Sequence, residues 1–519
     1  MSTRLEQPRD AEQAVTRAPG DVPLDLGPDA FRRAGHALVD RLAEFLTALP
    51  HSRLTAADAP AALRTTLDAA ASLPETGSDP ETLLHEAAEL LIAHSLFNGH
   101  PLFFGYITSS PAPIGMFGDL LAAAINPNVG AQRLSPAATE IEVQTIRWIT
   151  ELIGYPTDAG GLFVSGGNMA NMIALFAARV AAADWDVRKQ GLSGAGTRPL
   201  RVYASTETHT WLQKAAAISG IGSDAVRWIP VDEHARMRTE SLRSTIEADR
   251  AAGLTPLMVI GTAGTVSTGA IDPLFDIADI CRATGVWFHI DGAYGALAAP
   301  VPDAPHDLGA IHLADSVAVD PHKWLYAPLE AGCILVRDRT ALRNAFSYQP
   351  AYYQFGDDVN FYEYGPQNSR GFRALKVWLA LKQVGRSGYV RMIGDDIRLA
   401  ERLHARVAEH AELEPVSLSL SISTFRYVPA DLRAAPDTPE TREYIDTLNK
   451  QLVDRIQGSG EAFVSNAVVA GRYVLRACIV NFNTRAEHVD HLPDIVTRLG
   501  REIDRELRPD LRNVDGGSR

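Results

Sequence analysis

The first regular pattern along the chain is helical. Apolar residues recur every three or four positions after Gly27, with charged residues between them, and this spacing predicts an amphipathic helix. Its apolar face consists of Phe31, Ala34, Leu38, Leu42 and Phe45. Such a face must be buried somewhere. The pattern alone allows it to pack on its own domain or to clasp a second subunit.

From about residue 161 to 336 the pattern changes, and short β-rich runs alternate with helical stretches. Alternation of this kind, with apolar strands, predicts an α/β domain whose mostly parallel sheet is covered on both faces. The expected strands are Leu200–Ala204, Leu257–Gly261, Val286–Ile290 and Ser316–Val319, and the expected helices include Asn168–Ala183 and Leu274–Thr284. Sheets of this class bind ligands at the carboxyl ends of their strands.

The last third of the chain has the pattern of a smaller α+β domain. A polar, aromatic loop follows Phe346, and Arg373–Val384 is predicted as a helix. Two β-type runs, Leu418–Tyr427 and Tyr473–Asn481, precede a final amphipathic helix at Leu492–Leu507. We therefore predict four parts: a disordered arm (1–27), an N-terminal helical segment (28–105), for which clasping a partner is one of the two possibilities above, a large domain (106–385) and a small C-terminal domain (386–519).

Charge and cysteine content narrow the class of protein. The 519 residues carry a net charge of −14, which argues against nucleic acid or an anionic membrane as a partner. Cys281, Cys333 and Cys478 are too few and too scattered for a disulfide framework, as expected in a reducing compartment. Without an apolar run of the ~18–20 residues that a membrane span needs, and with a polar start, the chain is expected to be soluble and cytoplasmic.

Several common functional motifs are missing from the sequence, including GxxxxGK[ST], GxSxG, HExxH and a dinucleotide GxGxxG after a strand. His488 and His491 have a metal-like spacing but no accompanying ligand cluster, so we expect no bound metal. Three segments at predicted strand ends carry chemistry instead: Ser165–Asn171, Phe288–Gly295 and Asp320–Trp324.

These three segments match the needs of one cofactor. The glycine pair that precedes a helix in the first segment suits a phosphate, although a glycine pair alone is more often a tight turn. Asp291 ends an apolar strand and needs a cationic partner. Lys323 lies among apolar residues, where desolvation favours Schiff-base chemistry. A phosphate site, an acid for a ring nitrogen and such a lysine together indicate pyridoxal 5′-phosphate (PLP).

The same segments carry a family resemblance. Over roughly residues 28–483 the chain resembles the group II PLP-dependent decarboxylases, the family of aromatic L-amino acid, tyrosine, tryptophan and glutamate decarboxylases. The motifs are SPAATE at 135–140, SGGNMAN at 165–171, HTWLQKAA from 209, GTVSTGAID at 264–272, HIDGAYG at 289–295 and DPHKW at 320–324. The resemblance implies the aspartate-aminotransferase-like fold (fold type I) with a seven-stranded, mostly parallel sheet, and a homodimer with its active site at the interface.

The resemblance also implies roles for individual residues. Lys323 is the attachment and catalytic lysine, Asp291 pairs with the pyridinium nitrogen, and His209 stacks on the ring and assists catalysis. The other expected cofactor-binding residues are Gly167, Asn168, Thr265, Ala293 and His322. Asn168-Met169 stands where relatives carry Ser-Glu or Ser-Ala, and Val266 where many carry threonine.

Further positions match the substrate side of the family's site. Tyr352 is similar in position to a tyrosine on a mobile loop that reaches the partner's site and reprotonates the product. Tyr106, Ile107 and Arg370 match or neighbour positions that line the substrate pocket. The resemblance implies decarboxylation of a neutral, aromatic or other hydrophobic L-amino acid to its amine and CO₂. The alternatives are oxidative deamination to an aldehyde, carbon–carbon cleavage, or a catalytically silent interaction protein; the tyrosine at 352, which is typically phenylalanine in aldehyde-forming relatives, favours the amine.

Overall fold

The computed structural model describes residues 22, 24–194, 196–348, 358–434, 436 and 438–508. The chain divides into two compact units between Leu96 and Phe97. In the first unit α1 packs against α3, and α1 confirms the amphipathic helix that the spacing predicts. The elements of this unit are α1 (Gly27–Ala48), η1 (Leu49–His51), α2 (Pro60–Thr66) and α3 (Pro80–His94).

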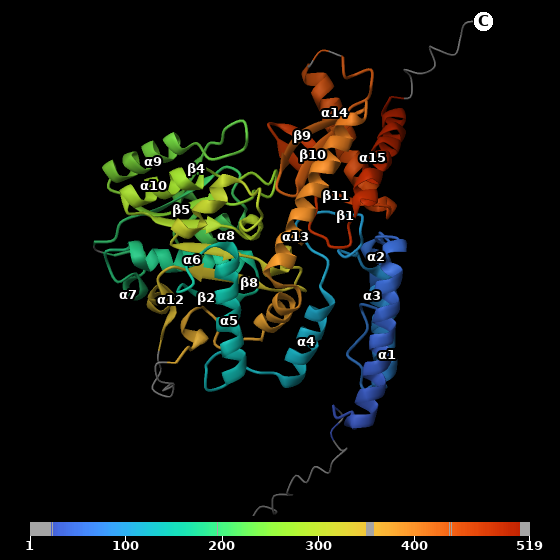
Figure 1. The fold of residues 1–519 in the computed structure, drawn as a ribbon, viewed down its shortest axis with the longest axis horizontal. Helices are drawn as coiled ribbons and strands as arrows, with labels where there is room; N and C mark the ends of the chain where they lie inside the picture. Colours follow the sequence, from blue (N-terminus) through green and yellow to red (C-terminus); the bar gives the residue numbers. More distant parts are fainter. Residues whose placement is uncertain are drawn as a thin grey trace, which may run out of the picture. The chain divides into compact units, whose positions relative to one another are not determined.

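A seven-stranded sheet forms the core of the larger part of the second unit, as predicted (Figure 1). Its strands, in spatial order, are β2 (Gly160–Val164), β8 (Gly332–Val336), β7 (Ser316–Val319), β6 (Trp287–Asp291), β5 (Thr255–Thr262), β3 (Leu200–Ser205) and β4 (Val226–Ile229). Only β8 runs antiparallel to its neighbours. The four predicted strands correspond to β3, β5, β6 and β7.

Helices and short turns cover this sheet and connect its strands. Helix α6 packs on β2 and β5 to β8, whereas α9 contacts β4 and β5 and α10 contacts β5 and β6. Every residue of β7 and β8 is buried, as expected for strands covered on both faces. The α-helices are α4 (Pro113–Ile125), α5 (Pro136–Ile153), α6 (Gly167–Ala182), α7 (Val187–Gln190), α8 (Trp211–Ile218), α9 (Thr239–Ala251), α10 (Leu274–Thr284), α11 (Pro321–Trp324) and α12 (Arg339–Phe346). The 3₁₀ turns are η2 (Ser223–Ala225), η3 (Gly295–Ala298), η4 (His306–Leu313) and η5 (Phe361–Glu363).

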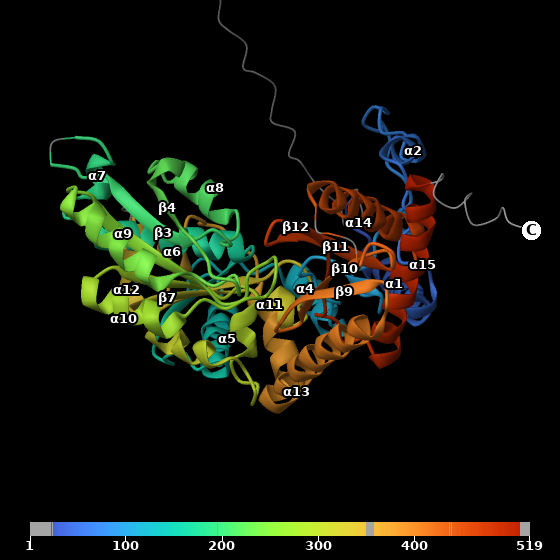
Figure 2. The same cartoon turned by 90° about the horizontal axis from the view of Figure 1, so that it is seen from above.

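A second, five-stranded sheet forms the smaller C-terminal domain, and Figure 2 shows α14 and α15 gathered around it. Its strands, in spatial order, are β1 (Phe103–Phe104), β11 (Phe463–Val469), β12 (Arg472–Cys478), β10 (Ile422–Tyr427) and β9 (Leu413–Ser419). Its helices are α13 (Ala374–Glu409), α14 (Pro439–Ser459) and α15 (Ala486–Leu507).

Two local features of this domain differ from the prediction. The run Leu418–Tyr427 is not one strand, because Leu420 adopts a left-handed backbone (φ 49°) and the chain turns back to form the β9–β10 hairpin. The predicted helix that ends at Val384 continues to Glu409 as α13 across a kink at Gly385 (φ 68°). Among the described helices, none is long and apolar enough to span a membrane.

Candidate active site

A cavity of about 130 Å³ lies where β2, β5, β6 and β7 end. This is the carboxyl edge of the parallel strands, the edge at which α/β sheets bind ligands. Seven residues predicted for the site line it: Ile107, Gly167, Asn168, His209, Asp291, Ala293 and Lys323. Its other lining residues are Asn171, Thr262, Gly264, Val266, Tyr294 and Asp320.

Gly166 and Gly167, at the start of α6, form a close-fitting glycine cradle. A Cβ atom on Gly167 would lie 2.7 Å from the Asp320 Oδ2 atom and 3.0 Å from the Ala293 Cβ atom, so only glycine fits without a shift. Gly166 has a φ of 146°, a conformation that side chains rarely adopt, and a Cβ there would lie 3.3 Å from the His322 ring. The cradle therefore brings backbone N–H groups and the positive end of the helix to the cavity.

Asp291 stands at the end of β6 with both carboxylate oxygens engaged. Its Oδ2 atom accepts a hydrogen bond of 2.8 Å from the Trp211 indole N–H, and its Oδ1 atom accepts one of 3.3 Å from the Ala293 backbone N–H. The residue is 7% exposed. A carboxylate buried to this degree and open to a cavity is suited to a cationic ligand atom.

Lys323 extends into the same cavity. Its Nζ atom lies 3.1 Å from the Oδ2 atom of Asp320, while the Oδ1 atom of Asp320 is buried and has no hydrogen-bond partner within the described ranges. Both neighbours of the lysine are anchored, because Ser109 donates to the carbonyl of His322 and the Trp324 indole donates to Asp396. The amine is thus presented by a rigid segment.

His209 completes the cavity from the loop between β3 and α8. Partial burial lowers its pKa below the usual 6.5, although the charge of Asp291 acts in the opposite direction. The Nδ1 atom accepts a 3.2 Å hydrogen bond from the backbone N–H of Trp211. The imidazole is therefore uncharged at neutral pH, with its proton on Nε2.

These residues fit PLP. The glycine cradle at a helix N-terminus suits the phosphate, Asp291 suits the ring nitrogen and Lys323 offers the amine that an aldehyde requires. The small side chain of Ala293, 7% exposed between them, leaves room for a flat ring.

Four other predicted site residues lie elsewhere or outside the described residues. His322 borders the cradle, and burial lowers its pKa. Thr265 turns its hydroxyl to Thr268 and to the Ala270 backbone. Tyr106 is 58% exposed and tilts against Phe463. Tyr352 is outside the described ranges.

Arg370 differs most from its predicted place at the substrate. It is 3% exposed and donates to Glu142 at 2.5 Å, to the Val129 carbonyl at 2.7 Å and to the Phe163 carbonyl at 2.8 Å. Its guanidinium is engaged inside the protein. The position supports a structural role and gives no support to substrate binding.

Asn171 and Asp320 also line the cavity, and no role was predicted for either of them from the sequence. A signal for each was present in the motifs. Asn171 lies four residues after Gly167 and therefore on the same face of α6, and Asp320 lies three residues before Lys323.

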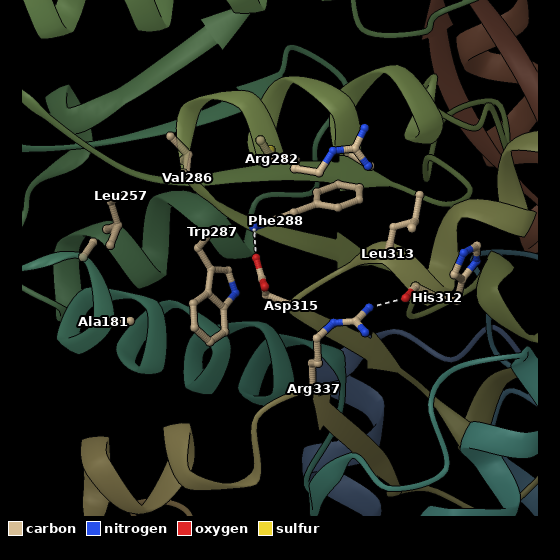
Figure 3. A pocket seen from close by; sticks show the side chains of 14 residues that line it. Ala181, Leu257, Arg282, Val286, Trp287, Phe288, His312, Leu313, Asp315 and Arg337 are labelled. Atoms are coloured by element: carbon tan, nitrogen blue, oxygen red, sulfur yellow. Dashed lines mark hydrogen bonds between the residues drawn. The ribbon is translucent and has the colours of Figure 1, made fainter.

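A larger cavity of about 540 Å³ lies at the opposite edge of the sheet, where β6 begins (Figure 3). Two of its polar side chains are engaged by the protein: Asp315 accepts from the Phe288 backbone N–H, and Arg337 donates to the backbone carbonyls of Ala314 and His312. The lysine and the aspartate with cofactor chemistry lie at the smaller cavity.

Comparison with known proteins agrees with this site. Residues 60–427 match the family model described as "Pyridoxal-dependent decarboxylase conserved domain". The aromatic-L-amino-acid decarboxylase of Bacillus atrophaeus is 34% identical over 486 residues, which cover 92% of this chain and 97% of that protein. The phenylacetaldehyde synthase of a Rosa hybrid cultivar is 30% identical over 89% of this chain and 92% of its own length. A crystal structure of Oryza sativa TDC with PLP and tryptamine superposes with a TM-score of 0.85 at 28% identity, over 93% of this chain and 99% of that one.

The chain belongs to the pyridoxal-dependent decarboxylase family, with fold type I and PLP as its cofactor. It is an amino acid carboxy-lyase of that family.

Proposed function

We propose that the protein converts a neutral, aromatic or other hydrophobic L-amino acid to its amine and CO₂. The supporting observation is the distribution of charge in the cavity. Asp291, Asp320 and Lys323 are the charged lining residues, and they surround the proposed cofactor position, whereas Ile107 and Val266 supply apolar lining. A charged substrate side chain against this apolar lining would be costly to bury. Names of relatives such as the aromatic-L-amino-acid decarboxylase support the same substrate class.

Each side chain has a distinct part in the proposed reaction. PLP supplies the electron sink that accepts the electron pair released when CO₂ leaves the substrate Cα atom. Lys323 would hold the cofactor through its side-chain amine, and Asp291 would keep a proton on the ring nitrogen by electrostatic preorganisation. His209 and Ala293 line the same cavity and would confine the ring, which would orient the bond that breaks.

We propose that the working unit is a homodimer in which Tyr352 reaches the partner's cavity and donates the proton to Cα. Exposed apolar side chains support such an interface. On α1 they include Phe31 (62% exposed), Val39 (42%), Leu42 (39%) and Leu46 (36%). Exposed apolar side chains that lie on one face of a helix are suited to an interaction site.

A second candidate is decarboxylation coupled to oxidative deamination, which gives an aldehyde. The observation that favours it is the 30% identity to a phenylacetaldehyde synthase. The tyrosine at position 352 favours the amine.

Product analysis tests the proposal. Purified holoenzyme is incubated with each of the twenty common amino acids, and CO₂, amine, aldehyde, ammonia and peroxide are measured. We expect CO₂ and amine in equal amounts from a neutral hydrophobic substrate. Aldehyde with ammonia and peroxide would establish the second candidate, and turnover of only acidic or basic amino acids would contradict the substrate class.

The matched variants for this assay are Lys323→Ala and Lys450→Ala. The first removes the proposed attachment amine and should abolish turnover. The second removes an exposed lysine of α14 and should leave turnover within about twofold, as for most surface substitutions. Turnover by Lys323→Ala equal to that of Lys450→Ala would refute the assigned lysine.

A further inference from the structure

We propose that Trp211 is a positioning residue that fixes both Asp291 and His209, the two side chains assigned to the ring of PLP. The inference rests on the proposed function, which assigns those two contacts. Trp211 is the first residue of α8 and is 1% exposed. It belongs to the motif HTWLQKAA, in which only His209 was assigned a role from the sequence.

The side chain of Trp211 fixes the carboxylate. Its indole N–H donates to the Oδ2 atom of Asp291 at 2.8 Å, while the Ala293 backbone N–H donates to Oδ1 at 3.3 Å. Donors at both oxygens define the plane of the carboxylate before a cofactor binds. Hydrogen bonds to an ionised group are stronger than neutral ones, and a stiff indole holds its donor in place.

The backbone of Trp211 fixes the histidine. Its N–H donates to the Nδ1 atom of His209 at 3.2 Å, which requires that this nitrogen carry no proton. The lowered pKa of His209 agrees with a neutral ring whose proton is on Nε2. The backbone N–H at position 211 therefore sets the tautomer of His209, and the indole side chain sets the orientation of Asp291.

The indole of Trp211 packs against a second buried ring, that of His289. Its ring meets the His289 ring edge-on, with centroids 6.1 Å apart and an interplanar angle of 83°. His289 is fully buried between Ser316 Oγ, 2.8 Å from Nδ1, and Asn171 Oδ1, 2.7 Å from Nε2. Burial lowers the pKa of His289 to about 4, so at neutral pH the tryptophan packs against an uncharged ring that its hydrogen bonds hold in place.

The experiment removes the indole N–H in two ways. In Trp211→Phe the donor is lost, and in a second variant benzothienylalanine at position 211 keeps the indole shape but replaces N–H by sulfur. The apoenzyme is titrated with PLP, and the visible absorption band is followed from pH 5 to 9. We expect both variants to bind PLP about 10-fold more weakly, as for the loss of a hydrogen bond to a charged group, and to shift the pH dependence of the band.

A double-mutant cycle separates positioning from general destabilisation. Asp291→Asn is combined with each position-211 variant. For each cycle, PLP affinity is measured for the wild type, the two single variants and the double variant. If Trp211 acts through Asp291, its substitution has less than a twofold effect in the Asp291→Asn background. An equal effect in both backgrounds would show a merely structural role and overturn the inference.

The control is Trp378→Phe, which removes an indole hydrogen bond of the same length, 2.8 Å to Gln144, and does not line the cavity. It should leave PLP affinity and the band unchanged.

If Asp291→Asn alone has no effect, the proposed role of Asp291 fails and the inference fails with it. If Asp291→Asn weakens binding but the benzothienylalanine variant matches wild type, only the inference is overturned. Should Trp211→Phe fail to fold, the isosteric variant decides.

Discussion

Burial favours the uncharged form of His209, and at the residue scale this charge state bears most directly on the proposed reaction. A charged imidazolium would face the cationic ring nitrogen of the proposed cofactor, so the neutral form is the active one. Because the pKa of His209 lies below 6.5, the neutral form persists at pH 6.5 and is lost only as the pH falls further.

This predicts an acid limb in kcat/KM with a midpoint below pH 6.5. The measurement is a pH–rate profile of the wild type and of His209→Gln, which cannot ionise in this range. The variant should lose that limb and be about 100-fold slower at neutral pH, the usual size of a general acid–base or positioning contribution. A wild-type midpoint at or above 6.5, or a limb retained by the variant, would contradict the assignment.

At the scale of elements, Asp396 joins α13 to the segment that carries Lys323. Its Oδ2 atom accepts from the Trp324 indole at 2.8 Å and from the Tyr326 hydroxyl at 2.7 Å, and burial raises its pKa to about 7. The folded protein therefore holds a proton that the unfolded chain releases near pH 4. The stability that this proton contributes is complete below pH 4 and is lost as the pH rises through 7.

We predict that Asp396→Asn removes this pH dependence. The variant should become more stable than wild type as the pH rises from 5 to 8, with a difference at pH 8 of up to about 4 kcal/mol, the free-energy equivalent of the pKa change. Urea denaturation at several pH values measures it. Parallel pH profiles for the two proteins would show that Asp396 does not titrate in this range.

The ion pair between Arg370 and Glu142 connects the segment before α13 to α5. The two side chains are 1% and 0% exposed, and Glu142 also accepts from the Phe163 backbone N–H at 3.0 Å. Arg370→Met leaves a buried carboxylate without its cation. We predict a loss of about 3–5 kcal/mol in the free energy of unfolding, with an unchanged KM for substrate.

The double variant Arg370→Met with Glu142→Gln is the control, because it removes both charges and should regain part of the stability. An increase of about tenfold or more in KM for Arg370→Met, with unchanged stability, would instead restore the substrate-binding role.

Much of the fold followed from local pattern. The apolar runs of β5 to β7 are explained by their burial, whereas the spacing in α1 predicted the helix although part of its apolar face is exposed. The hairpin at Leu420 could not be predicted, because a leucine gives no signal for a left-handed backbone and the β-type run continues through it. At the site, Lys323 and Asp291 could be predicted because each lies in a recognisable motif. The contact of Trp211 with Asp291 could not, because it joins residues 80 positions apart and depends on tertiary packing.

At the scale of the whole molecule, the proposed dimer explains the exposed apolar side chains of α1. We predict that the protein sediments as a dimer and that Leu42→Glu with Leu46→Glu converts it to a monomer with at least 10-fold lower activity, because charges at an apolar interface are costly to bury. Sedimentation velocity and turnover are measured together. Asp40→Asn, an exposed change on the same helix, is the control, and a wild-type monomer with full activity would contradict the proposal.

The attachment of PLP to Lys323 is the central claim, and chemical fixation tests it most directly. Borohydride reduces the carbon–nitrogen linkage between PLP and a lysine to a stable bond, after which the protein is digested and its peptides are analysed by mass spectrometry. The account predicts one pyridoxyl group per chain, on the lysine in the peptide that contains Asp320-Pro321-His322-Lys323. A pyridoxyl group on any other lysine, or none on a protein that turns over its substrate, would contradict it.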